Sequence, residues 1–173
     1  MGKIFDVSAI LKGADRFREV PKRAEQARSR AASTLARRLP VEARRDIQDE
    51  YNLTAGRINK GLSVRATSEY VELVGSSRGI GRIEFGGRRG ANGQVTYQVH
   101  RNGARQVLPH AFIANGLSGN TQIFERLTHK RLPIQAIYAA SIAQMLRKAG
   151  REERLITFSQ TILSAEIERL FGS

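Results

Sequence analysis

The chain has 173 residues, of which 40% are hydrophobic, and it contains no cysteine and no tryptophan. This length suits one domain, and the absence of cysteine excludes disulfides and thiolate metal sites. The net charge is +13, from 29 Lys and Arg against 16 Asp and Glu, which predicts attraction to polyanions such as nucleic acid or an acidic protein. The alternative interpretation is a solvated basic surface without a fixed partner. No apolar run approaches the ~20 residues of a transmembrane helix, so no membrane partner is expected.

The N-terminal region is predicted to be helical. Apolar residues recur at spacings near three and four through residues 8–38, as on one face of a helix. Pro21 is expected to open a second helical segment at its first turn. Residues 1–39 are therefore expected to form a helical extension, and residues 40–173 an α+β domain, together one cooperative unit. The small apolar stripe suits core packing or docking along a neighbouring subunit.

Residues 43–62 resemble a helix-turn-helix in outline. Pro40 is expected to start one helix that ends near Asn52, and Thr54 to cap a short second helix that stops at Gly61. A DNA-reading second helix would face the major groove. The residues that it would present are Thr54, Arg57, Asn59 and Lys60. The alternative function is therefore a basic nucleic-acid-binding module.

The middle of the chain is predicted to form a small antiparallel sheet or sandwich. Period-two patterns predict strands over residues 62–66, 71–73, 95–99, 105–108 and 112–114, with further strands near residues 80–85 and from residue 123. Asn102-Gly103 is a strong hairpin signal between two of these strands. Glycines are expected to curve the sheet.

Residues 86–93 are predicted to form an open loop, because four of these eight residues are glycine. Arg88 and Arg89 are expected at its tip, where they would reach DNA phosphates or an acidic neighbour. The alternative is simple exposure. The Gly-Lys-Ser/Thr of a nucleotide-binding loop is missing from this segment.

The C-terminal region returns to helix. Residues 141–148 and 151–171 have apolar positions at helical spacing, and Gly150 interrupts them. The predicted fold class is therefore α+β, with N-terminal helices, a small curved antiparallel sheet or sandwich and C-terminal helices.

No catalytic, cofactor or metal site is predicted. His100, His110 and His129 lack the spacing of metal ligands and are expected on the surface or in turns. The acidic residues between positions 46 and 50 lie among arginines and are read as ordinary ion pairing on a helix face. The Gly-x-Ser-x-Gly signature of hydrolases is absent. The expected function is not enzymatic.

Residues 108–145 combine apolar strands, glycine turns and a short helix, without a set of chemically active residues. In order and spacing, four motifs here resemble the prophage minor tail protein Z family of tailed bacteriophages. The motifs are Ala111-Phe112-Ile113, Ile123-Phe124-Glu125-Arg126, Arg131-Leu132-Pro133-Ile134 and Ser141-Ile142-Ala143-Gln144-Met145. Residues 44–60 also resemble the family, so that the similarity extends from about residue 28 to residue 145. The chain departs from it at Ala139-Ala140, where Gly-Pro is expected.

The resemblance implies a structural virion protein, assembled in the host cytoplasm, that helps to complete the tail at its head-proximal end. It implies a ring of identical subunits, expected to be a homohexamer, in contact with other tail proteins and the neck or connector. Non-specific contact with DNA in the channel is a further implication. Four arginines are candidates to face a neighbour or DNA. They are Arg88, Arg89, Arg126 and Arg131.

Overall fold

The computed structural model describes residues 21–67, 70–116, 119–128, 130–148 and 150–171. The predicted helical turns before Pro21, and His129, lie outside these residues. The elements, in chain order, are α2 (Pro21–Glu50), α3 (Ala55–Asn59), β1 (Leu62–Ala66), β2 (Val71–Gly75), β3 (Ile80–Gly81), η2 (Arg82–Glu84), β4 (Arg88–Arg89), β5 (Val95–Tyr97), β6 (Gln106–Leu108), β7 (Ala111–Asn115), β8 (Thr121–Arg126), β9 (Ile134–Ala136), β10 (Tyr138–Ala139), α4 (Ile142–Leu146) and α5 (Arg151–Phe171). The α+β class is confirmed.

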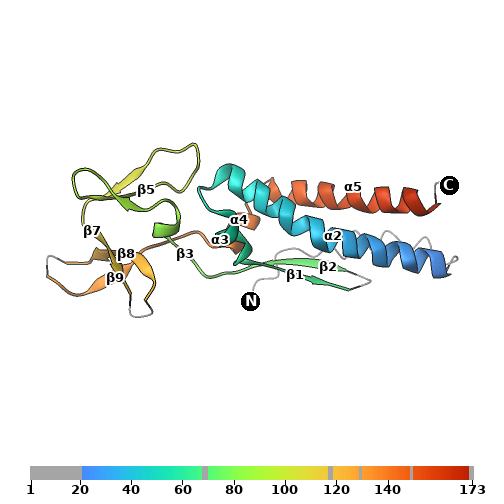
Figure 1. The fold of residues 1–173 in the computed structure, drawn as a ribbon, viewed down its shortest axis with the longest axis horizontal. Coiled ribbons are helices and arrows are strands. Elements are labelled where there is room, and N and C mark those ends of the chain that lie inside the picture. The colour runs from blue at the N-terminus through green and yellow to red at the C-terminus, as the bar shows by residue number, and fades with distance from the viewer. Residues whose placement is uncertain (1–20, 68–69, 117–118, 129, 149, 172–173) are drawn as a thin grey trace.

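The molecule is elongated and has two halves (Figure 1). The helical half contains α2, α3, α4, α5 and the β1–β2 hairpin. The β half contains β4 to β9, residues 88–136. The short β3–β10 pair lies between the halves, where the chain passes from the helical half into the β half and later returns. We call this part of the molecule the crossing. The position of any surface on the β half relative to the helices depends on it.

The long helix α2 spans 30 residues without interruption. It buries a stripe of residues at four-residue spacing, which runs along one face of a helix. The stripe is Ala27, Ala31, Leu35, Leu39, Ala43 and Ile47.

The prediction that Pro40 starts a new helix is wrong, because Pro40 lies inside α2. Proline removes one backbone N–H donor from a helix. Here the buried residues on both sides, Leu39 and Ala43, hold the helix on the core across that defect. The helix also crosses residue 39, where the sequence predicts a domain boundary.

The C-terminal helix α5 packs antiparallel along α2 (Figure 1). Leu155 and Ile162 are buried in this contact. The antiparallel register is visible in two side-chain pairs. Thr34 Oγ1 donates to Glu166 Oε1 at 3.4 Å, and Arg154 Nη2 donates to Asp46 Oδ1 at 2.7 Å. The alanines of α2 allow this close approach, since they add little bulk between the axes.

The predicted Thr54 cap and the predicted pair of strands after it are confirmed. Thr54 caps α3 by accepting a hydrogen bond from the Arg57 N–H, and Ser141 and Gln144 form a capping box that begins α4. β1 pairs antiparallel with β2, from Leu62 opposite Gly75 to Ala66 opposite Val71. The predicted alternation in this hairpin places Val71 and Leu73 in the core.

The strands form four small antiparallel sheets, where the sequence predicts a small curved antiparallel sheet or a sandwich. The sheets are β1–β2, β3–β10, β4–β5–β6 and β7–β8–β9. The segment near residues 80–85 is a two-residue strand followed by the 3₁₀ turn η2. The predicted hairpin around Asn102-Gly103 is confirmed, because Tyr97 of β5 is opposite Gln106 of β6. β7 and β8 form a second hairpin, which ends at Asn115 opposite Thr121. The separation into sheets follows from strands of two to six residues, too short for continuous pairing.

The two halves have unequal cores. The larger core lies in the helical half and takes in Phe85, which is fully buried at the crossing. The β half has a small core around Val95, Tyr97 and Ile123. Across the described ranges, no helix is long and apolar enough to cross a membrane.

Candidate assembly interface

Two of the four candidate arginines lie at the hairpin that joins β8 to β9. The Leu127 N–H donates to the Pro133 carbonyl at 3.3 Å, which closes the hairpin. Arg126 Nη1 donates across it to the Arg131 carbonyl at 3.1 Å. The Arg126 guanidinium carbon also lies 5.0 Å from the centroid of the Phe112 ring, a cation–π geometry. Arg126 thus braces the hairpin, while Arg131 is exposed.

Apolar side chains are exposed on the same hairpin. Leu127 is 57% exposed, Leu132 is 66% exposed and Ile134 is 39% exposed. We call Arg126, Leu127, Arg131, Leu132 and Ile134 the hairpin patch. Its apolar centre and cationic edge match the composition of protein interfaces, in which Arg is enriched. Covering the leucines with a partner would remove apolar surface from water.

A hollow of about 710 Å³ adjoins the hairpin patch. Phe112, Arg126 and Leu127 contribute to its wall, together with His110 from the turn before β7. The Phe112 ring stacks on Phe124, its partner on the neighbouring strand, with centroids 5.9 Å apart. The hollow therefore has an aromatic wall beside the exposed Leu127.

Arg88 and Arg89 do not lie at a loop tip, and that prediction is wrong. They form β4, in which Arg88 is opposite Thr96 and Arg89 is opposite Val95. The tip is instead the turn at residues 90–94, where Gly93 has φ of +75°, a value that favours glycine. Both arginines are exposed on an edge strand, where charge blocks unwanted pairing. Within the described ranges, no carboxylate forms an ion pair with either of them.

The alternative nucleic-acid residues lie on and around α3, which has only five residues. Such a helix is about 7.5 Å long, short for a helix that lies along the major groove. The Thr54 hydroxyl is occupied by the Arg57 N–H at 3.3 Å. Arg57 Nε lies 3.8 Å from Glu84 Oε1, whereas Asn59 and Lys60 are exposed. The structure thus brings these residues together on a short surface turn.

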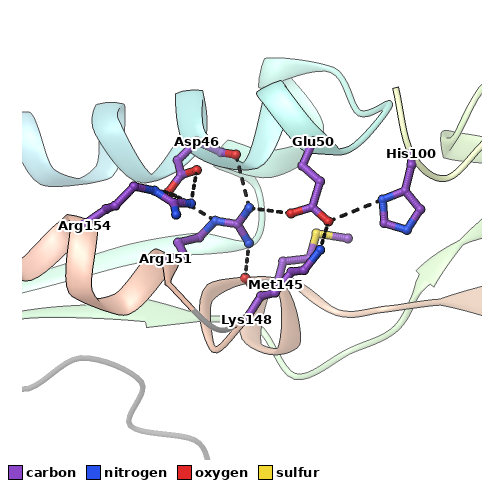
Figure 2. Close-up of polar contacts among 7 residues, drawn as sticks. All are labelled: Asp46, Glu50, His100, Met145, Lys148, Arg151 and Arg154. Atoms are coloured by element: carbon purple, nitrogen blue, oxygen red, sulfur yellow. Dashed lines mark hydrogen bonds and ion pairs between the residues drawn. The ribbon is translucent and has the colours of Figure 1, made fainter. Parts of the chain in front are cut away.

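A buried arginine joins three helices of the helical half (Figure 2). Arg151, at the first position of α5, is 1% exposed. Its guanidinium donates to the Met145 carbonyl, to the Asp46 carbonyl at 3.2 Å and to Glu50 Oε2 at 3.0 Å. Arg151 Nε also lies 3.4 Å from Asp46 Oδ2. One side chain therefore ties α4 and α5 to the end of α2.

Exposed side chains complete this network (Figure 2). Lys148 donates to Glu50 Oε1, and His100 Nδ1 lies 3.4 Å from the same oxygen. Arg154 holds both oxygens of Asp46, at 2.7 and 2.9 Å. Bidentate arginine–carboxylate pairs are geometrically specific. The network therefore fixes how the start of α5 lies against the end of α2.

The network shifts the ionisation of its members. Burial alone would raise the pKa of Glu50, but hydrogen bonds and positive charge from Lys148 and Arg151 outweigh it, so the pKa falls below 4.5. The hydrogen bond to Asp46 raises the pKa of Arg154. Burial, followed by the charge of Glu50, raises the pKa of Tyr51. Glu50 is therefore held in its charged form.

Backbone hydrogen bonds attach the β half to the end of α2. The Asn52 N–H donates to the Val99 carbonyl at 2.9 Å, and the Arg101 N–H donates to the Glu50 carbonyl at 2.8 Å. A β-bridge pairs Tyr51 with His100, whose rings are 5.1 Å apart. The position of the hairpin patch relative to the helices is set by these contacts.

Sequence reasoning identified the acidic cluster but not its role. Asp46 and Glu50 are one helical turn apart, which shows that they share a face. The spacing of Asp46 and Glu50 does not identify Arg151 as the arginine that lies between them. One signal in the sequence is that Arg151 directly follows Gly150, a residue that interrupts helices and that has φ of +80° in the structure. An arginine at such a helix start is poorly placed for the helix dipole and therefore calls for a partner.

Among the described residues, no group of three or more His, Cys, Asp or Glu could hold a metal ion. His110 is exposed in the turn before β7. No protein-family model, no curated protein and no solved structure matches this chain.

Proposed function

We propose that the chain is a structural virion protein of a tailed bacteriophage, a minor tail or tail-completion protein at the head-proximal end of the tail. The observation that carries the proposal is the hairpin patch, an apolar centre edged by Arg126 and Arg131. It coincides with two of the motifs that resemble the minor tail protein Z family. Its residues are exposed apolar side chains and arginines, which suit contact with a protein, and none of them has an evident chemical role.

The two-part architecture suits a ring. Subunits in a ring contact each other through two different surfaces, because the contacts are heterologous. β8 and β9 lie at the end of the molecule remote from the C-terminal end of α5 (Figure 1). The hairpin patch and the helical half are thus available to different neighbours. We propose a homohexamer whose other partners are tail proteins and the neck or connector, with non-specific contact with DNA in the channel.

The proposal predicts that the hairpin patch drives self-association. The double substitution Leu127→Ser and Leu132→Ser is expected to leave a monomer where the unchanged protein forms a ring, as measured by sedimentation velocity and native mass spectrometry. Val107→Ser is the matched control, since Val107 is an exposed apolar residue that lies in neither the hairpin patch nor the helical half. This control is expected to retain the ring. A ring that survives the double substitution would exclude the hairpin patch as the subunit contact.

The virion assignment is tested on particles. Mass analysis of purified tails is expected to find the protein in a fixed, small number of copies. Its absence from assembled tails would remove the proposal, whatever the oligomeric state of the isolated protein.

The second candidate function is a basic nucleic-acid-binding module, which the net charge of +13 favours. Binding to duplex DNA through charge alone is expected to be weak, equal for all sequences and steeply reduced by salt. Under that expectation Arg57→Ala leaves sequence preference unchanged. Sequence-selective binding that persists at raised salt would favour the module over the tail protein.

A further inference from the structure

A cavity of about 730 Å³ lies at the crossing between the two halves, within the size range of small-molecule sites. Its wall comes from both halves, because α3 and the β2–β3 connection meet β8 and β10 there. Neither the hairpin patch nor the Arg151 network contributes to it. The cavity is therefore a separate feature of the molecule.

Positive charge converges on this cavity from two segments. Arg57 and Lys60 line it from α3, and Arg78 lines it from the β2–β3 connection. Glu84 is the acidic residue in the lining, and it pairs with Arg57 at the long distance of 3.8 Å. In the part of the chain that the structure describes, no carboxylate lies within ion-pair distance of Lys60 or Arg78. The cavity thus holds an excess of positive charge that protein groups do not neutralise.

An aromatic ring accompanies the charge. Tyr138 lines the cavity and is 49% exposed. Its backbone is fixed, because Tyr138 pairs with Gly81 in the β3–β10 ladder. The absence of a side chain at Gly79 allows close approach, since a Cβ atom there would lie 3.1 Å from the Tyr138 Cβ. The ring is therefore held at the cavity by backbone contacts while one side of it remains open to solvent.

We propose that this cavity binds a nucleotide, with the phosphate between Lys60 and Arg78 and the base against Tyr138. Lysine and arginine bind phosphate through charge-assisted hydrogen bonds. Stacking of a base on an aromatic side chain tolerates any base. A carboxylate ligand would use the cations but not the ring. The nucleotide is either free or part of a single strand, because a duplex is too wide for the cavity. The site rests on observations separate from the hairpin patch and stands without the assembly role.

The test is titration calorimetry of the full chain at low salt with three probes. They are deoxyadenosine monophosphate, inorganic phosphate and a short single-stranded oligodeoxynucleotide. The double substitution Lys60→Ala and Arg78→Ala is expected to weaken monophosphate binding by about tenfold or more. The matched control, Arg37→Ala with Arg38→Ala, removes the same charge from the exposed face of α2. It is expected to change affinity by less than about threefold.

The contribution of the base is tested separately. Tyr138→Ala is expected to weaken monophosphate binding by about tenfold and to leave binding of inorganic phosphate unchanged. An oligonucleotide that binds more tightly than the monophosphate would identify a nucleic acid strand as the source of the nucleotide. Equal affinities would identify a free nucleotide.

The substitution Glu84→Gln tests the same site by strengthening monophosphate binding, whereas the other variants weaken it. Glu84 is half-exposed, so the substitution is expected to preserve the fold while tightening monophosphate binding about threefold to tenfold. Three results would overturn the proposal. They are no binding of the monophosphate by the unchanged protein, equal losses in the cavity variant and its control, and equal affinity for monophosphate and inorganic phosphate. Each leaves the ring of the proposed function unaffected.

Discussion

The helical half and the β half of this molecule are stabilised in different ways. In the helical half, α2, α4, α5 and the β1–β2 hairpin enclose a continuous apolar core, and Arg151 adds a buried polar tie beside it. In the β half, six short strands share a small core around Val95, Tyr97 and Ile123. The exposed leucines of the hairpin patch are in the half with less internal support. Covering these leucines would remove apolar surface from water, so the β half has more to gain from a contact at its surface than its own core supplies.

The largest effect is expected from the polar tie of the helical half. Arg151→Met should lower the free energy of unfolding by about 3–5 kcal/mol, because the Met145 and Asp46 carbonyls would lose their buried donor and Glu50 would lose one of its cationic partners. Urea denaturation followed by circular dichroism measures this loss. Arg154→Met is the control, since Arg154 is exposed, and should cost less than about 1 kcal/mol. Similar losses for the two variants would show that burial of Arg151 is not what matters.

The next largest effect on stability is expected from substitutions in the two cores. Leu39→Ala and Ile123→Ala each remove a fully buried aliphatic side chain and should each cost about 2–4 kcal/mol. Leu39→Ala should destabilise the whole molecule. Ile123→Ala should accelerate amide hydrogen exchange in β5, β7 and β8 while α2 stays protected, because the small core unfolds locally. Uniform acceleration in both variants would mean that the halves unfold as one unit.

A smaller effect is expected from pH. The pKa of Glu50 is lowered in the folded state, so the unfolded state binds the proton more tightly. The contribution of Glu50 to stability is therefore present above pH 4.5, the ordinary value, and is lost as pH falls through the folded pKa. Glu50→Gln should reduce the acid loss of stability by about 1 kcal/mol or less. Urea midpoints at a series of acidic pH values measure it, and an unchanged slope would contradict the assignment.

The smallest effect on stability is expected in the β half. Arg88→Ser with Arg89→Ser should change the free energy of unfolding by less than about 0.5 kcal/mol, because both side chains are exposed. The same variant should lower the yield of assembled tails or their retention of DNA. Equal yield, measured in a complementation assay, would show that this strand is merely a charged edge.

Helix caps and hairpins are the features of the fold that the sequence predicts best, because short-range contacts determine them. The Thr54 cap, the β1–β2 hairpin and the β5–β6 hairpin that contains Asn102-Gly103 depend on residues a few positions apart. The sequence predicts these three features correctly for that reason. Of the hairpin patch, the sequence predicts only the two arginines, Arg126 and Arg131. It does not predict the exposed leucines, because the exposure of Leu127 and Leu132 is a property of the folded surface.

Non-local contacts explain the remaining differences. Pro40 indicates a helix start by its own chemistry, but burial on both sides keeps α2 continuous. Arg88 and Arg89 lie in a glycine-rich segment, but pairing with β5 makes them a strand. The Arg151 network joins positions about a hundred residues apart in sequence. No periodicity or spacing in the chain encodes such a pairing.

The joint between the halves has a further consequence. The end of α2 is tied to the β half by main-chain atoms, through the Asn52 N–H and the Glu50 carbonyl. Since every residue other than proline carries the same main-chain groups, substitutions at Val99 or Arg101 can alter their side chains without removing these bonds. The angle between the two halves is therefore encoded in the path of the backbone, and the side chains around this joint can be exchanged without changing that angle.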